Sequence, residues 1–115
     1  KQMLEIAVKA ADSKRAEDIM ALEVKEISLL ADYFLICSAN TDRQISAIVD
    51  AIIEEEQKAK VQIRRVEGKD GGKWILIDLG DVIVHVFSTS ERAFYNLEKL
   101  WSDAPLVAIS DWIDE

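Results

Sequence analysis

Apolar residues recur at helical spacing in two stretches of the chain. Leu4, Ala7, Val8 and Ala11 predict an amphipathic helix over about residues 3–14. The same spacing from Ile45 to Ile53 predicts a second and stronger helix. Thr41, three residues before Gln44, can cap its start in a capping-box pattern. The acidic run 54–56 continues this helix, and we expect it to form solvated surface.

Three shorter segments have the composition of strands. Residues 19–24 predict a short strand, and the continuous apolar run 33–37 predicts a strand that is buried on both faces and central in a sheet. Residues 61–66 predict an edge strand. It leads into the glycine-rich stretch 67–72, which permits a tight reversal of the chain.

A hairpin is the most informative part of the pattern. Two apolar segments, 74–79 and 82–87, are joined by Gly80 and Asp81, and glycine at the first position of a two-residue loop favours a type II′ turn. The turn fixes the register, so one face carries only aliphatic pairs and belongs to the core. The other face carries the pairs Asp78/Ile83, Leu76/His85 and Trp74/Phe87. Such a mixture is not typical of a dry core, and it indicates a surface built to be covered.

A last helix follows the hairpin. Ser88 and Glu91 have capping-box spacing, and the apolar side of the helix is formed by Phe94, Leu97, Leu100 and Trp101. The opposite side has Arg92, Tyr95, Asn96 and Lys99. Helices interspersed with strands and an antiparallel hairpin predict an α/β fold, in which helices sandwich a mixed β-sheet.

Composition and net charge exclude several kinds of site and partner for this chain. The 115 residues suit one domain, 1–115, with a net charge of −8. One cysteine, Cys37, and one histidine, His85, exclude an intrachain disulfide and a Cys/His zinc site. The acidity argues against direct sequence-specific nucleic-acid binding and favours a basic protein as partner. No apolar run approaches the length that crosses a bilayer, so we expect a soluble protein without a membrane partner.

Several segments together resemble the Iojap family, the ribosomal silencing factors RsfS. The residues that carry the resemblance are Asp32–Ser38, Asp42–Gln44, Val66–Gly68, Trp74–Phe87, Arg92 with Tyr95–Trp101, and Asp103–Pro105. The pattern Asp-x-Gly-Asp-Val-x-Val-His-Val, followed by Tyr-x-Leu-Glu-x-Leu-Trp, is highly specific. The shared pattern covers about residues 4–105, and residues 106–115 form an extension beyond it.

The resemblance implies a fold, a function and partners. The expected topology is similar to that of the nucleotidyltransferase sheet, and the expected free state is a homodimer. The implied role is to bind a basic large-subunit ribosomal protein at the intersubunit face. There the factor would block joining of the small subunit and repress translation when nutrients are short. No cofactor, metal or catalytic residue is implied. We expect a cytoplasmic location, with an organelle as the alternative because the family has organellar members.

The hairpin and the last helix supply the candidate protein-binding residues. They are Trp74, Asp78, Asp81, His85, Arg92, Tyr95 and Glu98. For Trp74 the alternative is a core residue beneath the last helix, and for His85 it is a hydrogen-bonded structural residue. For the helix residues the alternative is an ordinary solvated face.

Asp78 and Asp81 also admit a rival function. Two carboxylates on a nucleotidyltransferase-like sheet could hold a metal for nucleotidyl transfer, which would make the protein an enzyme. That chemistry needs a Gly-Ser loop to hold phosphate, whereas the loop after the buried strand is Ser38-Ala39-Asn40. We therefore favour contacts between these carboxylates and Lys or Arg of a basic partner.

Overall fold

The computed structural model describes residues 2–68 and 73–113, except for the side chain of Glu98. Part of the predicted reversal at 67–72 therefore lies outside the described residues. The elements are α1 (Gln2–Ser13), β1 (Glu17–Glu23), β2 (Tyr33–Ala39), α2 (Asp42–Lys58), β3 (Arg65–Glu67), β4 (Trp74–Asp78), β5 (Val82–Ser88), α3 (Thr89–Tyr95), α4 (Leu97–Leu100) and the short 3₁₀ helix η1 (Ser110–Trp112).

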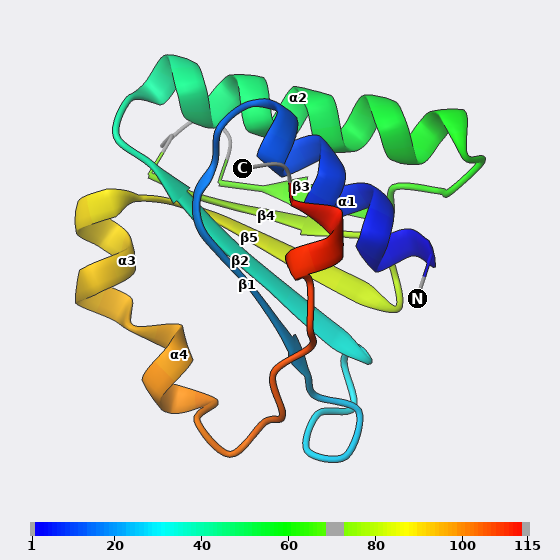
Figure 1. The fold of residues 1–115 in the computed structure, drawn as a ribbon, viewed down its shortest axis with the longest axis vertical. Helices are drawn as coiled ribbons and strands as arrows, with labels where there is room; N and C mark the ends of the chain where they lie inside the picture. The colour runs from blue at the N-terminus through cyan, green and yellow to red at the C-terminus, as the bar shows by residue number, and fades with distance from the viewer. Residues whose placement is uncertain (1, 69–72, 114–115) are drawn as a thin grey trace.

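The strands form one mixed sheet in the order β1-β2-β5-β4-β3 (Figure 1). β2 and β5 run parallel in the middle, while the other neighbours are antiparallel. The position of β2 between two strands confirms the central strand predicted from its apolar run. The observed β3 is shorter than the predicted strand, but it does lie at an edge. The α/β class with a mixed sheet is confirmed.

Helices pack on both faces of this sheet, and they cover the two faces unequally. α1 and α2 lie side by side over one face, where the larger apolar core forms. α3 and α4 pack on the other face, where a smaller core gathers around Phe34, Ile36 and Phe87. The helical cover on this second face reaches β5 and β2, and the β4 residues Trp74 and Leu76 are only partly buried.

The hairpin of β4 and β5 has the register predicted from its turn. Ile75 pairs with Val86 and Ile77 with Val84, and these aliphatic residues are buried beneath α1 and α2. Gly80 has φ +98°, a conformation that L side chains rarely adopt. The two-residue turn therefore places the predicted core face correctly.

α2 begins as its sequence predicts. The Oγ1 atom of Thr41 accepts a hydrogen bond from the backbone N–H of Gln44 at 3.1 Å. The other half of the capping box is absent, because the Gln44 side chain instead donates to the carbonyl groups of Lys14 and Arg15. This contact ties the end of the α1 segment to the start of α2.

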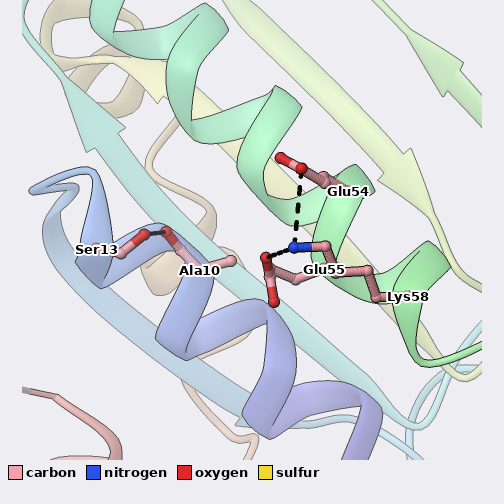
Figure 2. A network of polar contacts seen from close by, with 5 residues as sticks. All are labelled: Ala10, Ser13, Glu54, Glu55 and Lys58. Atoms are coloured by element: carbon pink, nitrogen blue, oxygen red, sulfur yellow. Dashed lines mark hydrogen bonds and ion pairs between the residues drawn. The ribbon is translucent and has the colours of Figure 1, made fainter.

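The acidic run of α2 does not all face solvent, so the expectation for 54–56 is wrong at one position. Glu54 and Glu55 are exposed and flank the ammonium group of Lys58, as Figure 2 shows. Glu56, in contrast, has no exposed surface, and neither of its carboxylate oxygens has a hydrogen-bond partner among the residues that the structure describes. It lies four residues after Ile52 and so continues the buried stripe of the helix.

The predicted last helix is broken in two. Asn96 adopts a left-handed conformation with φ 50°, which ends α3 and starts α4 in a new direction. The predicted apolar side is consequently wrong in part, because Phe94 and Leu100 are 79% and 73% exposed. Arg92, expected on the outer side, is buried instead.

The C-terminal segment closes one edge of the sheet. The backbone N–H of Glu23 donates to the carbonyl of Pro105, and that of Val107 donates to Ala21, so residues 105–107 run along β1. Trp112 then packs against the core under α1. In the part of the chain that the structure describes, no helix is long and apolar enough to cross a bilayer.

Candidate functional site

The outer face of the hairpin divides into a buried row and a half-buried row. On β5, Ile83, His85 and Phe87 are buried on the side of the smaller core. They are buried because α3, α4 and the residues that follow cover this strand. On β4, Trp74 and Leu76 are only half-buried. The sequence predicted a surface built to be covered, and the structure covers the β5 row with the chain's own helices while leaving the β4 row partly exposed.

Trp74 lies at the centre of an aromatic group. Its ring stacks on Phe87 with centroids 4.9 Å apart, and the ring of Tyr95 lies 4.6 Å away. Phe94 extends the group through an edge-to-face contact with Tyr95 at 5.1 Å. Since Phe94 is 79% and Tyr95 45% exposed, aromatic surface reaches solvent here. Exposed aromatic clusters of this kind are typical of protein interfaces.

A shallow groove runs beside Trp74. It has a volume of about 270 Å³ and is lined by Glu67, Gly68, Trp74 and Leu76. Gly68 has φ +84°, and a Cβ atom at this position would come within 2.1 Å of the Trp74 carbonyl oxygen. Only glycine fits this close approach, which sets the start of β4 against the end of β3.

We name five residues of this region the aromatic surface. They are Glu67, Trp74, Leu76, Phe94 and Tyr95. Sequence reasoning identified Trp74 and Tyr95. It missed Phe94, because the helix break at Asn96 was not visible in the helical periodicity. Leu76 could have been found from the hairpin register, which places it opposite His85 on the outer face.

His85 is part of the support beneath this surface rather than of the surface itself. Its residue exposure is 6%, and its Nδ1 atom accepts a hydrogen bond from the Trp74 indole N–H at 3.2 Å. Burial lowers the pKa of the imidazole to about 4, so the ring is neutral at physiological pH. This placement agrees with the alternative interpretation of His85 as a hydrogen-bonded structural residue. A ring that is buried this deeply cannot contact a partner protein directly.

Asp78 has internal contacts. Its Oδ1 atom accepts from the backbone N–H of Gly80 at 2.9 Å, and its Oδ2 atom lies 3.6 Å from Arg65 Nε. The side chain is only 18% exposed. Asp78 therefore shapes the hairpin turn, and reversing its charge would disturb the fold as well as any docking contact.

Asp81 is exposed and lies in a different neighbourhood. Its carbonyl accepts from the backbone N–H groups of Asp32 and Tyr33, at the far end of the hairpin from Trp74. At about 3.4 Å per residue, β4 alone separates the two ends by more than 10 Å. The segment before Asp32 exposes Ile27, Leu29 and Leu30. The structure therefore does not bring Asp81 together with Trp74 and Tyr95.

Arg92 joins α3 to the sheet. Its Nη1 atom donates to Ser38 Oγ at 3.1 Å and to the Glu17 carbonyl at 3.3 Å. With 8% exposure it is a structural contact in this fold rather than an exposed docking residue. Nearby Cys37 is fully buried, and burial raises the pKa of its thiol to about 12, so the thiol stays protonated and unreactive at neutral pH. The side chain of Glu98 lies outside the described residues.

Asn40, in the loop after β2, forms hydrogen bonds with side chains of β1 and α3. Asn40 Nδ2 donates to Glu17 Oε2 at 3.3 Å, and Asn40 Oδ1 accepts from Thr89 Oγ1 at 2.6 Å. Among residues 2–68 and 73–113, no three His, Cys, Asp or Glu side chains gather in a way that could hold a metal ion. The described carboxylates offer no assembled metal centre for the rival enzymatic function.

Comparison with known proteins decides the family. The family model described as "Ribosomal silencing factor during starvation" matches residues 1–115. The chain belongs to the RsfS family. The match includes residues 106–115, which the sequence analysis placed beyond the shared pattern.

Bacterial relatives match this chain over most of their length. The ribosomal silencing factor RsfS of Bacillus subtilis is 55% identical over 92% of this chain and 90% of its own. A crystal structure from Bacillus halodurans has 48% identity and a TM-score of 0.83, and it covers 93% of this chain and 97% of that one. A more distant mouse relative is named "Mitochondrial assembly of ribosomal large subunit protein 1". It is 28% identical to this chain, which spans 45% of its length.

Proposed function

We propose that this RsfS-family chain is a ribosomal silencing factor that docks through its aromatic surface. The partner is a basic protein of the large ribosomal subunit at the intersubunit face. Bound there, the chain would stand in the way of the small subunit and so lower translation when nutrients are short. The function rests on family membership. The choice of surface rests on one observation, the exposed aromatic group around Trp74.

Charge supports a basic partner. The chain carries a net charge of −8, and Glu67 brings a half-exposed carboxylate to the groove beside Trp74. Glu67 is paired at 3.0 Å with Arg65, whose side chain is itself 60% exposed, so the pair can exchange partners at little cost. An aromatic centre with an acidic rim suits a surface of Lys and Arg residues around an apolar patch.

The mechanism is steric and needs no chemical step. Trp74 and Tyr95 supply apolar contact area, while the sheet and α3 hold them in place. Asp81 and the neighbouring Ile27, Leu29 and Leu30 form a second exposed region that could contact the subunit separately. On this mechanism, silencing depends on occupancy alone, and the location follows that of the ribosome it binds, in the cytoplasm or in an organelle.

Sedimentation with isolated large ribosomal subunits tests this proposal. We expect the chain to pellet with the subunits without added nucleotide, and to dissociate as salt is raised. Trp74→Ala should weaken binding by about 30-fold, the loss of about 2 kcal/mol that is typical of an interface anchor. Trp112→Ala, on the opposite face under α1, is the control for loss of a tryptophan.

Two charge-reversal variants, one on the aromatic surface and one away from it, test the role of charge in binding. Glu67→Lys lies on the aromatic surface, and Glu54→Lys lies on the exposed side of α2 over the other face. The two side chains are similarly exposed, and each forms an ion pair with a basic residue of its own element, so they are matched. We expect only Glu67→Lys to weaken binding and to restore subunit joining in a gradient assay. Equal effects of the two variants would mean that net charge, rather than this surface, controls binding.

A further inference from the structure

The contact between Trp74 and His85 constrains the chemistry of both rings. An indole N–H can only donate, so the Nδ1 atom of His85 accepts and carries no proton. A neutral imidazole with a bare Nδ1 atom has its proton on Nε2. The hydrogen bond thus assigns the tautomer of His85.

This tautomer is unfavourable for the stability of the folded protein. The Nε2 atom of His85 is buried and has no hydrogen-bond partner among the described residues. The ring meets Phe34 edge to face at 5.1 Å and lies parallel to Phe87 at 6.2 Å, so its surroundings are aromatic. An aliphatic side chain would suit such a site without burying an unpaired N–H group. What an aliphatic side chain could not supply is the acceptor for Trp74.

We propose that His85 is a positioning residue for docking, and that its Nδ1 atom holds the Trp74 indole in the orientation that presents it beside Tyr95 and the groove. The inference rests on the proposed function, because it assumes that Trp74 contacts the partner. His85 itself is too deeply buried to touch that partner. Its contribution is to restrict the indole before binding, which lowers the entropy lost on docking.

The geometry explains why one hydrogen bond matters here. Trp74 is held on its inner side by stacking on Phe87 and beside it by Tyr95. Stacking on Phe87 is retained when the indole turns over by a half-turn about its Cβ–Cγ bond, whereas the hydrogen bond from the indole N–H selects one of these two orientations. Removing the acceptor leaves the stacking in place but permits the second orientation.

Two variants of His85 separate positioning from general stability. Leucine and asparagine have the same branching at Cγ and leave the same space where the ring was. Asparagine places an amide oxygen near the position of Nδ1, whereas leucine provides no acceptor. We expect His85→Leu to fold at least as stably as His85→Asn, because burying an amide is costly. We expect His85→Leu to bind large subunits three- to tenfold more weakly than His85→Asn.

The decisive result is that the two His85 variants rank in opposite orders for folding stability and for binding to large subunits. If His85 only supports the fold, binding will follow stability, and the asparagine variant will bind no better than the leucine variant. That result overturns the inference. A double-mutant cycle adds a second check, since His85→Leu should cause no further loss of binding in a Trp74→Ala background.

The unmodified protein provides a check that does not depend on variant folding. The indole N–H signal of Trp74, assigned by its loss in Trp74→Phe, should exchange with solvent much more slowly than a free indole. Exchange as fast as that of an exposed indole contradicts the inference. Wild-type binding by Trp74→Ala would instead refute the docking surface itself, so the two failures are distinguishable.

Discussion

Glu56 offers a direct test of the buried stripe on α2. The side chain has no exposed surface, and burial raises the pKa of its carboxyl group from 4.5 to about 8. The folded protein therefore holds a proton on Glu56 at neutral pH that the unfolded chain releases. We expect Glu56→Gln, which keeps the shape but cannot ionise, to remove this difference.

The sign and size follow from proton linkage. Between pH 4.5 and 8 the folded state binds more protons than the unfolded state, so the free energy of unfolding falls as pH rises. His85 acts oppositely, because its lowered pKa makes stability fall as pH drops from 6.5 toward 4. The two effects offset each other below pH 6.5. Above pH 6.5 the remaining contribution of His85 is small, and that of Glu56 up to pH 8 is a loss of roughly 2 kcal/mol.

Urea denaturation at half-unit steps from pH 6.5 to 8.5 measures this loss. The stability gap between Glu56→Gln and wild type should widen by roughly 2 kcal/mol from pH 6.5 to 8, because all other titrating groups cancel in the difference. Glu55→Gln is the matched control, since Glu55 is half-exposed on the neighbouring position of the same helix. Its profile should run parallel to that of wild type.

A constant gap would refute the reasoning. It would mean that the Glu56 carboxyl is ionised in the folded state, which requires water or a cation at a site that the structure shows closed. A gap that narrows with pH would mean that ionisation stabilises the fold. Either result would place Glu56 outside the core.

Four further outcomes are expected. Gly68→Ala should cost more than about 1 kcal/mol in urea denaturation, because its Cβ would meet the Trp74 carbonyl and its φ is positive. Thr41→Ala should cost about 1 kcal/mol through loss of the helix cap, measured in the same way. Excess magnesium with any nucleoside triphosphate should leave the melting temperature unchanged, whereas a bound ligand at 100 times its dissociation constant would add about 2.7 kcal/mol. A shift that Asp78→Asn abolishes would favour the enzymatic alternative. Light scattering of free protein should give about twice 13.0 kDa, and a monomer mass at high micromolar concentration would contradict the homodimer.

The hairpin shows what sequence can predict here. Gly80 and Asp81 set the turn, and alternation then assigned Ile75 and Ile77 to the core without any long-range information. The central position of β2 followed from its unbroken apolar run. In both cases a local pattern has one physically reasonable solution.

The wrong predictions concern residues whose burial depends on how their helix packs against other elements. The apolar periodicity after Ser88 is that of one continuous helix. It does not indicate that Asn96 adopts a left-handed conformation and separates α3 from α4. Within α3, Phe94 lies about 200° around the helix axis from Arg92, so it faces solvent while Arg92 reaches back to Ser38. Glu56 resembles its exposed neighbours in composition, but its helical phase matches Ile52.

The sequence predicted which residues share the outer face of the hairpin, but not how deeply each of them is buried. The register placed Trp74, His85 and Phe87 on one face, and that is where they lie. How much of the face remains open depends on where α3 and α4 stop, which the hairpin pattern does not encode. The row of β5 was therefore assigned to the surface although it is buried.

The parallel pairing of β2 with β5 sets the order in which this chain can fold during synthesis. β2 lacks its central neighbour until Val82–Ser88 has been made, and the β1 edge stays open until Pro105 and Val107 arrive. Pairings between such distant segments are slow and come late. The aromatic surface needs both β5 and α3 behind it. A nascent copy therefore cannot present this surface before the residues of α3, up to Tyr95, have been synthesised.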